Sequence, residues 1–205
     1  MMTKTIPVKI LMLSFILILS ACAYAPNVHN ARVLSKIDMP VKRMMFVYRD
    51  LQMKKHQRYS RGNVTIADVG FENFGPKLVD NVSDVFFKYG VTIETSVLYP
   101  AGKKIDYQSI VLEDDNKPLY LMTVFPLKGK ITANRHSTRV SYVFNAVVMN
   151  MKSRKAIWTA KIDTGTWKGQ DFLQRHLPST EYDKEYAIQL LDSLALEMKK
   201  AKIIQ

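Results

Sequence analysis

The single cysteine of this 205-residue chain is the residue whose position points most directly to a specific chemistry. Cys22 follows an apolar run at residues 10–19, and Lys4 and Lys9 precede that run without any acidic residue before it. A basic start, a short apolar core and small residues before a cleavage point are the anatomy of a secretory signal peptide. The run is about half of the roughly 20 apolar residues that a membrane span requires, which disfavours a transmembrane helix. A buried core helix is disfavoured by the position at the extreme N-terminus.

The tetrapeptide Leu19-Ser20-Ala21-Cys22 resembles the lipobox of bacterial lipoproteins. The resemblance implies cleavage between Ala21 and Cys22 and a lipid on the Cys22 sulfur. Each buried CH₂ of such a lipid contributes about 0.8 kcal/mol, so several acyl chains give stable membrane attachment. By the sorting rule of enterobacterial lipoproteins, Ala23 in place of Asp implies the outer membrane. We therefore expect an outer-membrane, lipid-anchored protein whose domain faces the periplasm.

Removal of a signal peptide at residues 1–21 limits what the rest of the chain can be. It leaves 184 of the 205 residues, which suits one domain. Because the only thiol is lipidated, no disulfide can form and the fold must rest on its hydrophobic core. The net charge of +12 falls by two, since Lys4 and Lys9 leave with the signal. Export argues against nucleic acid, the usual partner of a chain with a pI near 9.7.

A basic cluster occurs within residues 49–73, where Lys54, Lys55, Arg58 and Arg61 lie close together in the sequence. One interpretation is a surface loop that contacts anionic lipid headgroups or an acidic glycan. The other is a solvated loop or exposed helix, which is the commoner fate of a charge run. Residues 64–66 are expected to form a short strand.

The other ionisable residues form no catalytic pattern. The four histidines are not spaced as HxxH, HExxH or HxH, which disfavours a metal site. Neither a GxSxG elbow nor a glycine-rich phosphate loop occurs. The acidic run Glu113-Asp114-Asp115 lacks the alternation of a calcium loop. We expect no enzyme, no metal and no cofactor. The histidines are His29, His56, His136 and His176.

The hydrophobic pattern predicts where the folded domain begins and how its first half is built. Residues 22–38 contain Pro26 and few apolar residues, and they are expected to be a lipidated tether before a domain at residues 39–205. A strand is expected at residues 41–48. A helix is expected at 76–89, with Pro76 in its first turn and Gly90 as its cap. A strand at 91–97 then completes a strand–helix–strand crossover.

The second half of the chain predicts an antiparallel meander and a final helix. Strands are expected at residues 119–125, 139–151 and 155–167, with a turn at Lys128-Gly129-Lys130 and another at residues 151–154. Residues 178–202 carry an apolar stripe at helical spacing. The helix is expected to pack on the sheet, with a membrane-surface helix as the alternative. The predicted fold class is α/β (α+β), a single mixed sheet with a crossover, a meander and a packed C-terminal helix. The stripe comprises Tyr186, Leu190, Leu194 and Met198, widened by Ala187 and Leu191.

This order of elements, together with the lipobox, resembles the small α/β envelope lipoproteins. They include the curli-secretion lipoprotein, the activators of penicillin-binding proteins, the N-terminal domain of the Tol-system protein and the auxiliary lipoprotein of ABC-type lipid transport. The likeness rests on the helix–glycine–strand junction at residues 88–93, the hairpin at 141–150 and 156–160, and the terminal helix at 185–200. It implies a binding or scaffold domain without catalytic residues.

We therefore expect an accessory or scaffold lipoprotein that binds an envelope partner protein. The alternatives are a lipid-transport auxiliary that contacts phospholipid and a cell-wall glycan hydrolase.

Overall fold

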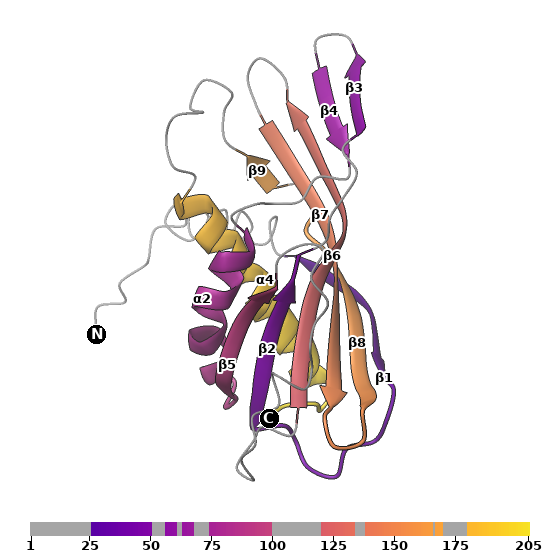
Figure 1. Ribbon diagram of the computed structural model, residues 1–205, viewed down its shortest axis with the longest axis vertical. Coiled ribbons are helices and arrows are strands. Elements are labelled where there is room, and N and C mark those ends of the chain that lie inside the picture. The colour runs from indigo at the N-terminus through magenta and orange to yellow at the C-terminus, as the bar shows by residue number, and fades with distance from the viewer. Residues whose placement is uncertain are drawn as a thin grey trace, which may run out of the picture.

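The protein folds around one mixed β-sheet that carries two helices on one face (Figure 1). The computed structural model describes residues 26–50, 56–60, 63–67, 74–99, 120–133, 138–165, 167–169 and 180–205. In this part of the chain, the main strand order is β1-β8-β7-β6-β2-β5, and β3, β4 and β9 attach beside that path. The predicted fold class is confirmed.

The elements have the following bounds. The strands are β1 Asn27–Val33, β2 Arg43–Arg49, β3 His56–Ser60, β4 Asn63–Ala67, β5 Thr92–Tyr99, β6 Tyr120–Ala133, β7 Thr138–Asn150, β8 Lys155–Asp163 and β9 Trp167–Gly169. The helices are α2 Phe74–Phe87 and α4 Thr180–Lys200.

The predicted crossover is formed by β2, α2 and β5. The strands β2 and β5 pair in parallel, and β2 also pairs in parallel with β6, so β2 lies inside the sheet. Met44 to Tyr48 are all buried, in agreement with the apolar run that predicted a strand covered on both sides. Gly90 has a φ of 72°, the left-handed conformation expected of the residue that ends α2.

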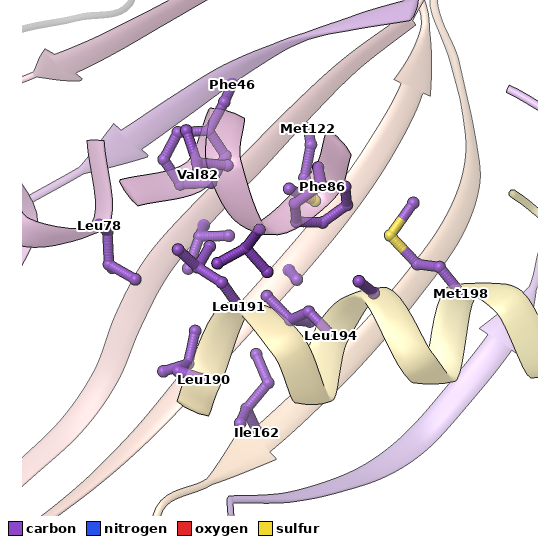
Figure 2. Packing of buried hydrophobic residues seen from close by; sticks show 14 of the residues in the cluster. Phe46, Leu78, Val82, Phe86, Met122, Ile162, Leu190, Leu191, Leu194 and Met198 are labelled. Carbon is purple, nitrogen blue, oxygen red and sulfur yellow. The ribbon is translucent and has the colours of Figure 1, made fainter. Parts of the chain in front are cut away.

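The hydrophobic core lies between the sheet and the two helices (Figure 2). Phe46, Met122 and Ile162 project from the strands toward α2 and α4 and are fully buried. The whole predicted stripe of α4 is buried against them, so this helix packs on the sheet and the membrane-surface alternative is wrong. Each large apolar side chain buried in this way contributes about 1.5–3 kcal/mol. The facing helical residues are Leu78, Val82, Phe86, Leu190, Leu191, Leu194 and Met198.

The hairpin β7–β8 follows the predicted alternation. Tyr142, Phe144, Ala146 and Val148 are buried in the hydrophobic core, and the residues between them are half-buried on the opposite face. The turn lies at residues 151–154 as expected, and Arg154 there has a φ of 55°.

The expected tether at residues 22–38 is too long. Residues 27–33 form β1, which pairs antiparallel with β8 from Asn27 opposite Asp163 to Val33 opposite Trp158. The folded domain therefore begins at least twelve residues before residue 39. The strand was missed because it lies at the edge of the sheet with most of its side chains exposed, so its sequence lacks an apolar alternation.

The expected turn at Lys128-Gly129-Lys130 is also wrong. β6 continues to Ala133, and a bulge between Pro126 and Lys128 absorbs the irregularity in its ladder. A bulge is a usual accommodation for proline, which has no N–H to donate within a sheet. The loop or helix expected within residues 49–73 contains instead the hairpin β3–β4, of which only residues 64–66 were expected as a strand.

Candidate functional site

The β6–β7 hairpin extends beyond the part of the sheet that the helices cover, and it carries extra strands there (Figure 1). The strand β4 pairs with β6 from Ala67 opposite Lys130 to Val64 opposite Ala133, and β3 pairs with β4. On the other side, β9 pairs with β7. We call this extension the arm; it comprises β3, β4, β9, residues 127–133 of β6 and residues 138–143 of β7.

The arm is basic and contains no Asp or Glu among its described residues. Ion pairs among the described residues join Arg43 to Glu94 and Lys200 to Glu197, both outside the arm. The positive charge of the arm is therefore not balanced by carboxylates of its own strands. The basic residues of the arm are His56, Arg58, Lys128, Lys130, Arg139 and Lys168.

Sheet register places three of these residues in one row. One cross-strand row runs Arg58, Thr65, Thr132, Arg139 and Lys168, from β3 through β4, β6 and β7 to β9. Thr132 and Arg139 stand directly opposite each other, so their side chains share a face of the sheet. We call this set the basic row.

The exposed charges of β6 and β7 share one face of the arm. Lys128, Lys130 and Thr132 are spaced two residues apart along β6, so they lie on the same face of the sheet. Arg139 of β7 stands opposite Thr132 and shares that face. Lys128, Lys130 and Arg139 are all exposed. Val140 and Tyr142 take the other face of β7 and are buried. The basic face therefore continues the sheet face that lies opposite α2 and α4.

The base of the arm adjoins the start of the folded domain. One cross-strand row begins at Asn27, the first residue of β1. It continues through Asp163 of β8 and Val143 of β7 to Lys128 of β6. The chain that leads toward Cys22 thus enters the sheet at the same level as Lys128.

Hydrogen bonds fix the end of β8 at this level. The Thr164 hydroxyl, which is buried, accepts from the Tyr142 backbone N–H at 2.9 Å, and the Thr164 N–H donates to the Tyr142 carbonyl at 3.0 Å. The Asp163 carboxylate accepts from the Gly165 N–H at 2.8 Å. Gly165 has a φ of 61°, which glycine adopts without steric cost. These contacts hold the base of the arm to the sheet.

A second surface with functional character lies on the helical layer. Phe87 at the end of α2 is 75% exposed and Leu196 on α4 is 44% exposed. The Tyr89 hydroxyl, in the turn that follows α2, donates to the Asp192 carboxylate of α4 at 2.8 Å. Burial, followed by this hydrogen bond and the Asp192 charge, raises the pKa of Tyr89 to about 12. Leu196 lies one turn beyond Asp192 on the same face of α4. We call Phe87, Tyr89 and Leu196 the helix-layer patch.

The sequence-predicted site residues meet these surfaces only in part. Of the predicted anionic-contact set, Arg58 lies in β3, in the basic row, whereas Lys54, Lys55 and Arg61 lie outside the described residues. Ala21 and Cys22 also lie outside them. The sequence prediction missed Lys128, Lys130, Arg139 and Lys168. The available signal was Lys128-Gly129-Lys130, which was interpreted as a turn.

The described residues offer no group of three or more His, Cys, Asp or Glu side chains that could hold a metal ion. His29 lies half-buried in β1 and His56 lies in β3, while His136, His176 and the acidic run at 113–115 fall outside the described ranges. None of the described helices is both long enough and apolar enough to cross a bilayer.

Comparison with known proteins finds distant structural likeness. No protein-family model and no curated protein matches the chain. Similar solved structures include the PelC dodecamer of Paraburkholderia phytofirmans, with 9% identity over 83% of this chain and 97% of that chain and a TM-score of 0.42. A DUF330 protein of Xanthomonas campestris shares 12% identity over 85% and 90% of the two chains, with a TM-score of 0.36.

A neuraminyllactose-binding hemagglutinin homolog of Helicobacter pylori shares 10% identity over 82% and 90%, with a TM-score of 0.34.

Proposed function

We propose that this protein is a lipid-anchored accessory or scaffold protein of the bacterial outer membrane, without catalytic activity, that binds an envelope partner protein through the helix-layer patch. The observation that carries the proposal is the exposure of Phe87, 75%, on a helical layer where most other large apolar side chains are buried. Isolated exposed apolar residues are ordinary. Here a second exposed apolar residue, Leu196, lies on the neighbouring helix α4, and the hydrogen bond from Tyr89 to Asp192 links the turn after α2 to that helix. Aromatic residues, including phenylalanine, are enriched at protein–protein interfaces.

The anchor is tested separately from the patch. Cys22→Ser should leave the precursor unprocessed or detach the protein from membranes. Mass spectrometry of the native chain should find the N-terminal peptide beginning at Cys22 with an added lipid mass. A native chain that begins at another residue, or whose Cys22 carries no lipid, contradicts the anchor.

The patch is tested by cross-linking the anchored protein in intact membranes and identifying the captured protein. We expect one reproducible partner for the native chain. The double variant Phe87→Ala/Leu196→Ala should lose capture by tenfold or more, since a hot-spot aromatic typically contributes 2 kcal/mol or more. Met39→Ala is the matched control, because Met39 is 77% exposed but lies on the segment before β2. Equal capture by the double variant and the control contradicts the role of the patch.

The basic arm favours a second candidate function, that of a lipid-transport auxiliary that contacts phospholipid. The supporting observation is the exposed face of Lys128, Lys130 and Arg139, since the described residues of the arm include no Asp or Glu. Protein extracted from membranes should then carry phospholipid in a fixed molar ratio, measured as lipid phosphorus. A ratio that falls to zero on mild washing contradicts this candidate.

A cell-wall glycan hydrolase is the third candidate, and the same purified protein tests it. We propose that it does not turn over peptidoglycan. Release of soluble glycan fragments from peptidoglycan would contradict the non-enzymatic assignment and both functions above.

A further inference from the structure

We infer that the basic face of the arm docks on the anionic phospholipid headgroups of the membrane that holds Cys22, and so sets the orientation of the domain on that membrane. This inference rests on the lipid anchor of the proposed function. It goes beyond that function by assigning the arm a ligand, the phosphate-bearing surface of the bilayer.

The first step is the length of chain between anchor and sheet. Five Cα–Cα steps separate Cys22 from Asn27, where β1 begins. A fully extended chain covers at most about 3.3–3.6 Å per residue, so Asn27 stays within about 17 Å of Cys22. A tether over residues 22–38 would have reached about 60 Å and left the orientation free. The edge strand β1 therefore holds the sheet close to the bilayer surface.

The second step is which end of the sheet is held there. Lys128 is in the same cross-strand row as Asn27, three strand spacings away, which is about 14 Å. The row of Arg139 lies four residues further along β7, about 13 Å beyond Val143. By contrast, Lys155 at the far end of β8 lies eight residues from Asp163, about 27 Å from the level of Asn27. The anchored end of the sheet is the end that bears the arm.

The third step is charge complementarity. Lys128, Lys130 and Arg139 are exposed on one face, and no acidic residue occurs in the described arm. A Lys or Arg near an anionic membrane surface shifts binding about fivefold (1 kcal/mol), so these three residues supply on the order of a hundredfold. An acidic protein has the same complementary charge. The bilayer is favoured because the lipid anchor keeps the arm beside it, which gives the headgroups a high effective concentration at the arm. An acidic protein must instead reach the arm by diffusion.

The test uses the mature lipidated chain in vesicles that carry a headgroup-attached quencher. Because Cys22 is the only cysteine and is lipidated, an introduced cysteine is the only free thiol for a fluorescent label. Ser141→Cys labels the basic face of the arm, opposite Lys130. Ser153→Cys labels the exposed turn at the far end of the β7–β8 hairpin. One vesicle set contains phosphatidylethanolamine and phosphatidylglycerol, and the other replaces phosphatidylglycerol with phosphatidylcholine.

We expect strong quenching at residue 141 in the anionic vesicles alone and little at residue 153 in either set. Substituting Gln for Lys128, Lys130 and Arg139 should lower the ratio of docked to undocked protein on the order of a hundredfold. Substituting Gln for Lys152, Arg154 and Lys155, which are equally charged and exposed in the far turn, should leave it unchanged. Raising the salt from 0.1 M to 1 M shortens the Debye length from about 10 Å to about 3 Å and should also undock the arm.

Three results overturn the inference. One is equal quenching at residue 141 in the two vesicle sets, and another is stronger quenching at residue 153. The third is a change in the fluorescence of the label at residue 141 only when envelope proteins are added, which would make an acidic protein the ligand of the arm. Flotation before the fluorescence measurement identifies failure of the anchor itself. A chain that does not float with either vesicle set refutes the lipid anchor and removes the tether argument with it.

Discussion

Replacement of Gly75 by alanine should destabilise the protein, although alanine is the better helix former. Gly75 lies in the first turn of α2, where the helix crosses β2 and β5. A Cβ at this position would lie 2.6 Å from Cε1 and 2.7 Å from Cδ1 of Tyr48, and 2.8 Å from Cδ1 of Leu98. Leu98 is 39% exposed and has space to move away. The Tyr48 ring is 2% exposed and does not, because it is enclosed by the core.

The expected size of the effect follows from two opposing terms. Alanine in place of glycine inside a helix adds about 1 kcal/mol to the free energy of unfolding. Overpacking a closed core typically removes about 1–3 kcal/mol, and a contact of 2.6 Å with an enclosed ring places this site in the upper part of that range. We therefore expect Gly75→Ala to lower the free energy of unfolding by about 1–2 kcal/mol.

Urea unfolding measures this change, with the fluorescence of the buried Trp158 as one probe. The midpoint should fall while the slope stays constant, because the surface exposed on unfolding is nearly unchanged. Ser83→Ala is the control, since Ser83 is exposed on the same helix and alanine there should add about 0.5 kcal/mol. A midpoint that rises for Gly75→Ala as it does for Ser83→Ala would refute the close-approach argument and leave helix propensity as the deciding term.

Three further predictions concern the contacts that hold the arm and the helical layer. Thr164→Val should cost about 1–3 kcal/mol in urea unfolding, because it leaves the buried Tyr142 N–H without its 2.9 Å acceptor; Thr164→Ser should retain most of the stability, and equal losses would contradict this role. The free energy of unfolding should decline as the pH rises from 10 to 12, because the pKa of Tyr89 is about 12 in the folded protein and 10 in the unfolded chain. The stabilisation by Tyr89 is therefore complete below pH 10 and is lost as the pH rises toward 12. Tyr89→Phe should reduce that decline, and an unchanged pH profile would show that the hydroxyl does not contribute. Leu194→Ala should cost about 2–5 kcal/mol because the side chain is fully buried, whereas Leu196→Ala, 44% exposed, should change the urea midpoint little; similar midpoints for the two would contradict the assigned faces of α4.

The sequence predicted the elements whose burial is periodic. The α4 stripe and the β7–β8 alternation each repeat at the spacing of their own secondary structure, so local sequence suffices to identify them. Gly90 marked the end of α2 for the same reason, since a left-handed φ is a local requirement. The crossover followed from these elements because short connections restrict how strands and helices can be arranged.

The elements that the sequence did not reveal are those stabilised by partners distant in the chain. β1 has mostly exposed side chains and is defined by its hydrogen bonds to β8, more than a hundred residues later. β6 continues through Gly129 because Tyr142 pairs with it there, although the local sequence resembles a turn. Both features lie on or beside the arm, so the arm itself was not predicted.

The sequence by itself predicted lipidation at Cys22, and it determined the basic charge and the identity of the helices, since each depends on residue types and their near neighbours. It also identified Arg58 as part of a basic cluster. Only the tertiary structure placed Arg58 in one row with Arg139 and Lys168, and only it brought Lys128 level with Asn27, where β1 begins. The physical reason is that strand register is set by hydrogen bonds between segments far apart in sequence, and no local pattern encodes which residues those bonds place opposite each other.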